Sequence, residues 1–352
     1  MNSVTRRTTA SDRPRILNKI LASAATTFLL VIADSSMAAD GSVRLQDGRQ
    51  LCYSEYGDPR GQLVLFFHGT PGSQRDAAVV HEELRAAHIR LITPSRPGMG
   101  LSTFDPGRRI LDWPADVSQL VAAVGEPDQA FGILAMSGGT PYALATVRAM
   151  PYRITHVTIA SAFAPPEACV PKTDANQTLD FMDRRPRLAR LGVGLMGRRL
   201  DTKPEKVLKH VAHGWSETDR QLVLCSPKLK REVIATLREA TRCGPDGVLH
   251  DSRLLSSCWG FQVCEAQGPP ICLFHGGEDE VAPVQMAYWL QAQLPGSSLT
   301  VDPRAGHLST LWWHAEEILD TFDAPRAVVP TLPAPELAEP ELAVPVLPGP
   351  VQ

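Results

Sequence analysis

The sequence predicts an α/β fold, with a mainly parallel sheet covered by helices on both faces and a helical segment inserted into it. The chain has 352 residues, of which 43% are hydrophobic, and a net charge of -3, which suits one large water-soluble domain. In both outer parts of the chain, short apolar runs typical of strands alternate with segments of helical periodicity. Strands that alternate with helices in this way pair in parallel. The middle part has helical periodicity without a convincing strand. We therefore expect an N-terminal extension at 1–38, a first core segment at 39–163, a helical cap at 164–265, a second core segment at 266–322 and a tail at 323–352.

Both ends of the chain are expected to lie outside the core. At the N-terminus, arginines precede an apolar run at 20–33 and the small residues Ser36-Met-Ala38, a layout that resembles a secretory signal. Met37 is an alternative start, so we expect a cytoplasmic protein if the chain begins there and an exported one if it does not. The run at 20–33 is too short for a stable membrane span. The proline-rich tail repeats Pro-Glu-Leu-Ala and is expected to be disordered.

Charge and cysteine content argue against several classes of function. The 38 acidic residues outnumber the 35 lysines and arginines, and no stripe of basic and aromatic residues stands out, so nucleic acid is not an expected partner. The seven cysteines contain no Cys-x-x-Cys pair, and we interpret them as scattered thiols. We expect neither a metal site nor a cofactor. The sequence carries no indication of an oligomeric state.

The elements before residue 125 are predicted from alternation, turns and apolar runs. Residues 42–56 alternate around Asp47-Gly48, which predicts a hairpin. The continuous apolar run at 63–67 is typical of a buried strand. A helix at 76–87, a strand at 90–93 and a helix at 113–124 complete two strand-helix units.

Ser137 lies in the segment around which we expect the chain to be organised. Apolar residues at 131–136 predict a buried strand, and an alanine-rich helix is predicted at 140–150. A serine in so tight a turn between strand and helix adopts a strained conformation that presents its hydroxyl above the sheet. The two glycines that follow relieve the crowding, and Ala135 stands where the usual Gly-x-Ser-x-Gly pattern has its first glycine. The helix also directs its positive end at the serine.

The remaining elements follow the same patterns. Residues 154–159 predict a strand, and the predicted helical cap begins with arginines that we interpret as a solvated helix face: Arg184, Arg185, Arg187, Arg190, Arg198 and Arg199. The core then resumes with a strand at 270–275, a helix at 284–293, a strand at 298–301 and a helix at 308–322.

Three residues with complementary chemistry follow predicted strands, in the order Ser137, Asp279, His307. Imidazole can take the serine proton as general base, and a carboxylate can fix its tautomer and stabilise the imidazolium. Glu278 and Glu280 compete with Asp279 for the carboxylate role. The order is that of the α/β-hydrolases, whose fold the chain resembles from about residue 41 to residue 322. The run Asp-Glu-Val-Ala-Pro is similar to the acid loop of that family, which favours Asp279.

Two further segments carry this resemblance. The run His68-Gly-Thr-Pro-Gly72 is similar to the oxyanion loop of the family, which implies that the backbone N–H groups of Thr70 and Gly138 stabilise an oxyanion. In such loops the histidine braces the turn, so we assign His68 no role in proton transfer. The segment Ser-Arg-Pro-Gly-Met-Gly-Leu-Ser at 95–102 also resembles the family, with serine in place of its usual aspartate. We interpret this segment as support for the fold rather than for the chemistry.

The resemblance implies a serine hydrolase that forms an acyl-enzyme on a carboxylic ester, with a small to medium, largely apolar substrate. A proline iminopeptidase-like aminopeptidase with a peptide-like substrate is an alternative, suggested by the His-Gly-Thr-Pro-Gly run, and a thioesterase or lactonase is another. An aminopeptidase needs acidic residues for the substrate amine. The acidic residues of the helical segment are expected to face solvent: Glu217, Asp219, Glu232 and Glu239. A non-catalytic ligand-binding protein of the same fold is the remaining alternative.

Overall fold

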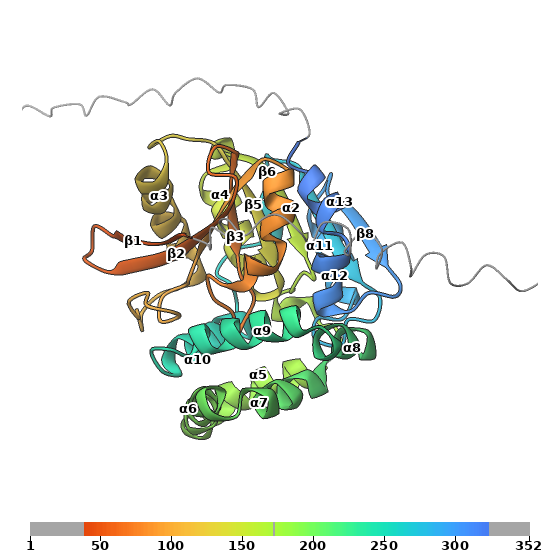
Figure 1. Ribbon diagram of the computed structural model, residues 1–352. Helices are drawn as coiled ribbons and strands as arrows, with labels where there is room; N and C mark the ends of the chain where they lie inside the picture. The colour runs from red at the N-terminus through yellow and green to blue at the C-terminus, as the bar shows by residue number, and fades with distance from the viewer. Residues whose placement is uncertain (1–38, 172, 324–352) are drawn as a thin grey trace, which may run out of the picture. The chain divides into compact units, whose positions relative to one another are not determined.

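The computed structural model describes residues 39–171 and 173–323, and within them the chain forms an eight-stranded sheet of order β1-β2-β4-β3-β5-β6-β7-β8 (Figure 1). The strands are β1 (Ala39–Arg44), β2 (Gln50–Gly57), β3 (Gln62–Phe67), β4 (Ile89–Pro94), β5 (Phe131–Met136), β6 (Ile154–Ala160), β7 (Ile271–Gly276) and β8 (Ser298–Asp302). β2 runs antiparallel to β4, and every pairing from β4 to β8 is parallel. The predicted mainly parallel α/β fold is therefore confirmed.

The central strands β3 and β5 correspond to the apolar runs at 63–67 and 131–136. Every residue of β5 is buried, and so is every residue of β3 after the first. Ala135 of β5 lies beside Phe67 of β3 and Ile159 of β6. Because parallel strands end at the same edge of a sheet, the residues that follow β3, β5 and β6 lie close together.

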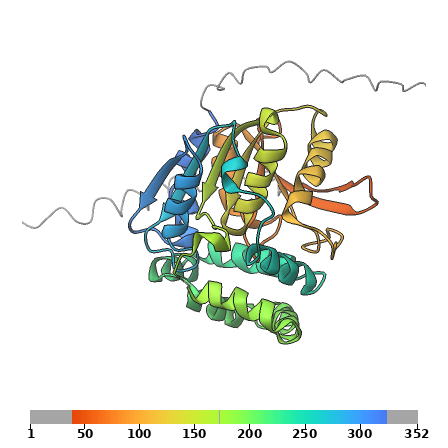
Figure 2. The ribbon, with the colours of Figure 1, turned by 180° about the vertical axis from the view of Figure 1, so that it is seen from behind.

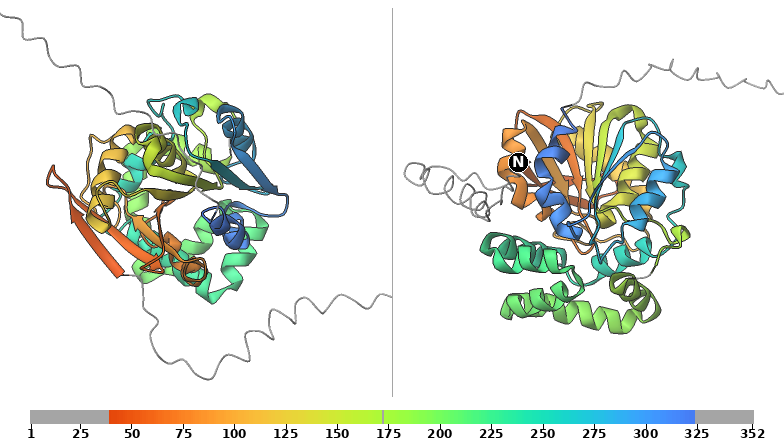
Figure 3. Two further views of the ribbon diagram at one scale, coloured as in Figure 1. Left: turned by 90° about the horizontal axis from the view of Figure 1, so that it is seen from above. Right: turned by 90° about the vertical axis from the view of Figure 1, so that its right-hand side faces the viewer.

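Helices cover both faces of the sheet (Figures 1 and 2). One face carries α2 (His81–Ala86), α12 (His307–Trp313) and α13 (Ala315–Asp320), and the other carries α3 (Trp113–Val124), α4 (Thr140–Ala149) and α11 (Gln285–Gln293). The side view in Figure 3 shows the sheet between these two layers. This arrangement agrees with the predicted layers.

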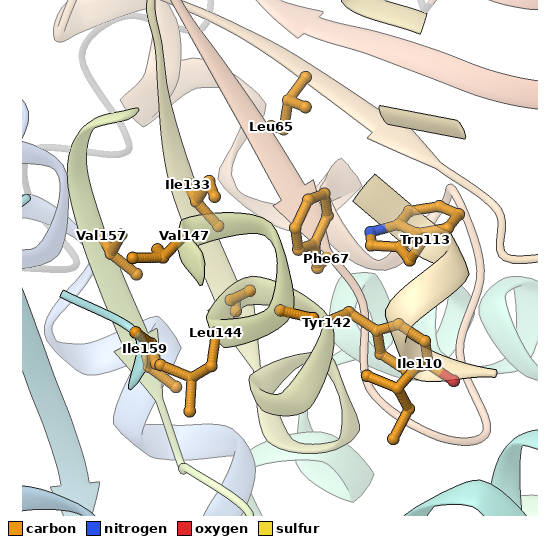
Figure 4. Packing of buried hydrophobic residues seen from close by; sticks show 14 of the residues in the cluster. Leu65, Phe67, Ile110, Trp113, Ile133, Tyr142, Leu144, Val147, Val157 and Ile159 are labelled. Carbon is orange, nitrogen blue, oxygen red and sulfur yellow. The ribbon is translucent and has the colours of Figure 1, made fainter. Parts of the chain in front are cut away.

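Among the described residues, a large buried cluster packs α3 and α4 against the sheet (Figure 4). The ring of Trp113 lies edge-on to the ring of Phe67, at 5.5 Å between centroids, and edge-on to the ring of Tyr142, at 5.9 Å. Burying one large apolar side chain contributes about 1.5–3 kcal/mol to stability. The cluster therefore holds α4, and the turn that precedes it, firmly against β5.

Two predicted helices are divided in the structure. The helix expected at 76–87 begins as a 3₁₀ turn, η1 (Asp76–Val80), because Val80 leaves the helical conformation before α2. The helix expected at 308–322 is interrupted at His314, with φ -107° and ψ 21°. The two ring nitrogens of His314 lie 3.2 Å from carboxylate oxygens of Asp302 and Glu317, and these contacts accompany the break between α12 and α13.

In the described residues between β6 and β7, six α-helices lie outside the sheet, and we call them the helical insertion (Figure 1). They are α5 (Asp174–Arg184), α6 (Pro186–Thr202), α7 (Pro204–Val211), α8 (Glu217–Cys225), α9 (Pro227–Ala240) and α10 (Asp246–Leu255). α8, α9 and α10 lie nearer the sheet than α5, α6 and α7. The six arginines predicted to form a solvated helix face are exposed. The predicted domain limits at 163/164 and 265/266 stay predictions.

The predictions for the two ends of the chain lie outside the described residues. These are the signal-like extension at 1–38 and the proline-rich tail, of which only Asp323 is described. Among the helices that the structure does describe, none has the length and apolar composition needed to cross a membrane.

Candidate active site

Ser137 lies in the sharp turn between β5 and α4, at the start of the 3₁₀ turn η3 (Ser137–Gly139). Its φ of +51° is in the left-handed region that residues with a side chain seldom adopt. A Cβ atom on Gly139 would lie 2.1 Å from the carbonyl oxygen of Phe67, so only glycine fits there. The strained turn predicted from the sequence is present, and it places Ser137 at the carboxyl edge of the sheet.

The two predicted oxyanion donors lie next to each other and to the serine. A Cβ atom on Gly138 would lie 2.6 Å from Oγ1 of Thr70 and 3.0 Å from Cδ1 of Leu255. A Cβ atom on Gly69 would lie 4.0 Å from Oγ of Ser137. The loop after β3 and the turn after β5 therefore meet at the position where the sequence predicts an oxyanion site.

His307 and Asp279 are in direct contact. Nδ1 of His307 lies 2.8 Å from Oδ2 of Asp279, and each residue is only 6% exposed. Burial disfavours the charged imidazole, but the charge and hydrogen bond of Asp279 outweigh this effect and raise the pKa of His307. Of the three acids that the sequence left open, Asp279 is the one that contacts the histidine, whereas Glu278 and Glu280 are exposed.

A second histidine, which no sequence motif marks, supports the same carboxylate. Nε2 of His275 lies 3.4 Å from Oδ2 of Asp279 and 2.8 Å from the carbonyl oxygen of Ala282. Burial lowers the pKa of His275, so this ring is neutral and donates its Nε2 proton to Ala282. Asp279 therefore faces one neutral imidazole and one with a raised pKa.

The segment after β6 contacts both the serine turn and the histidine. The hydroxyl of Thr140 donates to the carbonyl oxygen of Ser137 at 2.7 Å and accepts from the N–H of Phe163 at 3.0 Å. The hydroxyl of Ser161, two residues before Phe163, donates to the carbonyl oxygen of His307 at 2.6 Å. Ser137 and His307 therefore approach the same short segment. Within the described residues, no hydrogen bond joins Oγ of Ser137 to the His307 ring; such contacts often tighten only when substrate binds.

His68 braces the loop after β3, as the resemblance implied. Its Nδ1 donates to the carbonyl oxygen of Gly69 at 2.8 Å, and its Nε2 accepts from the N–H of Arg96 at 3.2 Å. Burial and the nearby guanidinium of Arg96 hold the pKa of His68 well below its usual range, so the ring is neutral. Arg96 also donates to the carbonyl oxygens of His68, at 2.6 Å, and Gly69, at 2.8 Å. The segment 95–102 thus supports the site as well as the fold.

Asp251 of α10 completes this support, and sequence reasoning missed it. It accepts hydrogen bonds from Arg96, Arg108 and the Tyr142 hydroxyl at 2.6–3.2 Å, and also from the hydroxyl of Thr70. Burial alone would favour the protonated acid, but the two guanidinium groups hold the pKa of Asp251 well below its usual range. The local sequence signal for this position is helical spacing: Val248 and Leu255, three residues before and four residues after Asp251, are apolar and lie on the same buried face of α10.

Asp219 of α8 corrects a prediction. The sequence predicts that it faces solvent, yet it is fully buried. Its Oδ2 accepts from the N–H groups of His307, at 2.6 Å, and Leu308, at 3.1 Å, and its Oδ1 accepts from the N–H of Ser309 at 2.8 Å. These donors begin α12 and have no partners within their own helix, which is why a buried carboxylate is stable there.

Comparison with known proteins gives one family match and many similar structures. Residues 64–324 match the model of a family described as alpha/beta hydrolase family. A comparison with curated protein sequences gives no significant match.

Three of the similar solved structures are a hydrolase, an esterase and an enol-lactonase. A hydrolase from Pseudomonas aeruginosa is 18% identical, with 83% of this chain and 100% of that chain covered and a TM-score of 0.61. An esterase from a Rhodococcus species is 19% identical, with 81% and 98% covered and a TM-score of 0.58. An enol-lactonase from Burkholderia xenovorans is 14% identical, with 80% and 98% covered and a TM-score of 0.57. Because the sequence identities are this low, these similarities show a shared fold alone.

Proposed function

The chain belongs to the alpha/beta hydrolase family, and on that premise we propose that it is a serine hydrolase that cleaves a carboxylic ester through an acyl-enzyme. Ser137 is the nucleophile, His307 the general base and then acid, and Asp279 the carboxylate that orients the imidazole. The backbone N–H groups of Thr70 and Gly138 are the oxyanion donors. The observation that carries the proposal is the strained Ser137 turn, at the same sheet edge as the 2.8 Å contact between His307 and Asp279.

The reaction uses protein groups and water. Oγ of Ser137 attacks the ester carbonyl carbon while its proton passes to Nε2 of His307, and the two donor N–H groups stabilise the oxyanion. The bond to the leaving alcohol breaks as His307 returns the proton to that oxygen. Water then attacks the acyl-enzyme by the same route, which releases the acid and restores the Ser137 hydroxyl.

An apolar substrate is favoured by the surroundings of the donors. Leu255 of α10 lies beside Gly138, and the buried cluster that includes Leu255 also contains Phe163 and Met286. An acyl group beside Gly138 would therefore contact the apolar side chain of Leu255. The esterase and the enol-lactonase among the similar structures are named for cleaving ester bonds, which agrees with an ester substrate.

The aminopeptidase alternative is less well supported. It needs a carboxylate that is available to bind the substrate amine. The two fully buried aspartates of the helical insertion, Asp219 and Asp251, are already occupied by protein donors, and Glu239 pairs with Arg242. An ester therefore fits the site better than a peptide with a free amino end.

Labelling with a fluorophosphonate probe, followed by hydrolysis assays, tests the proposal. Wild type and Ser137→Ala are compared, and wild type is then assayed with p-nitrophenyl esters of increasing chain length and with prolyl-p-nitroanilide. We expect labelling that depends on Ser137, turnover of the esters and no cleavage of the amide. A folded wild type that neither labels nor hydrolyses any ester would refute the proposal, and cleavage of the prolyl amide would favour the aminopeptidase.

A further inference from the structure

Two buried aspartates of the helical insertion each contact one half of the proposed catalytic site. Asp251 reaches the loop at 68–72 that carries the donor Thr70, and Asp219 reaches the start of α12, where His307 lies. Both aspartates are 0% exposed. A buried carboxylate is costly unless protein donors replace its lost water, and here those donors belong to the site itself.

The contact of Asp251 is with a side chain whose backbone N–H is a proposed oxyanion donor. The Thr70 hydroxyl donates to Asp251 and accepts from Nη2 of Arg96 at 2.8 Å. Nη2 and Nε of Arg96 in turn donate to Asp251, at 2.7 Å and 3.1 Å. Thr70 is therefore held from both sides, and the same hydroxyl lies against Gly138, the other proposed donor.

The contact of Asp219 is with the backbone of the proposed general base. Its two oxygens accept from three consecutive N–H groups, and Oδ1 also accepts from the hydroxyl of Ser309 at 2.7 Å. A Cβ atom on Gly306 would lie 2.6 Å from Oδ2 of Asp219, so glycine before the histidine permits this close approach. These bonds fix the position of His307 relative to the insertion.

We propose that Asp251 and Asp219 are positioning residues, through which the helical insertion holds the oxyanion donor Thr70 and the base His307 in their working positions. This inference rests on the proposed function. Misplacing a donor or a base by a fraction of an ångström lowers the rate of the chemical step and leaves substrate binding nearly unchanged. The insertion then contributes to catalysis as well as covering the site.

The two residues differ in one measurable respect. Among the described residues, the titratable groups that face His307 are Asp279 in the loop after β7, Asp219 on α8, and His275 on β7. The negative charge of Asp219 adds to that of Asp279 in raising the pKa of His307. Removal of this charge lowers that pKa, whereas Asp251 acts on the loop at 68–72 and leaves it unchanged.

The experiment measures kcat, KM and the pH dependence of kcat/KM on a p-nitrophenyl ester for three variants. They are Asp251→Asn, Asp219→Asn and Thr70→Val, the last of which removes the hydroxyl link to Asp251 while keeping the donor N–H and the buried ion pairs. Matched controls are Asp246→Asn on α10, which is half-buried, and Glu217→Gln on α8, which is exposed; each of the two residues is paired with an arginine. Should Asp251→Asn fail to fold, Thr70→Val carries the test.

We expect kcat to fall about 10- to 100-fold in Thr70→Val and in a folded Asp251→Asn, with KM little changed. Asp219→Asn should move the acidic limb of its profile to lower pH, and the controls should match wild type. An active wild type together with an unchanged kcat in Thr70→Val and an unshifted profile in Asp219→Asn overturns the inference. A wild type that neither labels with fluorophosphonate nor turns over esters refutes the proposed function itself, and this inference with it.

Discussion

Nδ1 of His307 lies 2.8 Å from Oδ2 of Asp279, and the other oxygen of that carboxylate accepts from the N–H groups of Val281, at 2.9 Å, and Ala282, at 2.7 Å. These three hydrogen bonds hold the carboxylate against the imidazole ring of His307. Because both side chains are nearly buried, water screens their interaction little.

Asp279→Asn should lower kcat about 10³- to 10⁴-fold on a p-nitrophenyl ester, because an amide in that position favours the wrong imidazole tautomer. The fold should survive, since asparagine has the shape of aspartate, and circular dichroism checks this. Glu278→Gln and Glu280→Gln are the matched controls and should keep nearly full activity. An equal loss in Glu280→Gln would show that the acid has been assigned wrongly.

The pH dependence of kcat/KM should reflect the raised pKa of His307. In the proposed mechanism only the neutral imidazole accepts the Ser137 proton, so kcat/KM should rise with pH and reach half its maximum above about 6.5, the ordinary pKa of histidine. In Asp279→Asn the midpoint should move to lower pH, because the largest charge that favours the imidazolium is lost. A midpoint in wild type below that of the variant would contradict this assignment.

The raised pKa of His307 should also make the unfolding free energy depend on pH. A histidine whose pKa is higher in the folded state stabilises the fold below its unfolded pKa, and this contribution is lost as pH rises through the folded pKa. The difference in unfolding free energy between wild type and His307→Gln should therefore be largest in acid and shrink above pH about 6.5. Urea unfolding at several pH values measures it, and a difference that grows with pH would refute the prediction.

Gly138→Ala should separate activity from folding. Its new Cβ would lie 2.6 Å from Oγ1 of Thr70, a side chain that Asp251 and Arg96 hold in place, so the donors should be displaced and kcat should fall about 100-fold. In Gly139→Ala the clash is with the backbone of Phe67, and this variant should fail to fold stably. Activity assays and thermal melts of both variants test this contrast. If Gly138→Ala were as active as wild type, the prediction would be contradicted.

Gly192→Ala should stabilise the protein by about 0.5–1 kcal/mol without changing activity, because alanine favours a helix interior over glycine. Gly192 lies within α6, and a Cβ atom there meets nothing within 4 Å. Gly197→Ala in the same helix is the control, since its Cβ would lie 3.2 Å from Oγ1 of Thr241 and the gain should disappear. Urea unfolding measures both variants, and a destabilised Gly192→Ala would argue against the helix at that point.

The strands and the serine turn were predictable because their signals are local. Apolar runs at 63–67 and 131–136 identify the buried strands, and a serine directly between strand and helix predicts the positive φ found at Ser137. The break at His314 was not predictable, because it coincides with a contact to Asp302 on β8, twelve positions earlier in the chain. Local patterns describe what neighbours along the chain do, and not which distant groups meet.

By itself the sequence determined the α/β class, the Ser137 turn and the order of Ser137, Asp279 and His307 along the chain. The tertiary structure decided which acid contacts His307 and which charges are buried behind the site. Asp219 accepts from a residue 88 positions away and Asp251 from one 155 positions away. An aspartate is stable in the interior only when such donors surround it, and the packing of the helical insertion against the sheet is what brings them there.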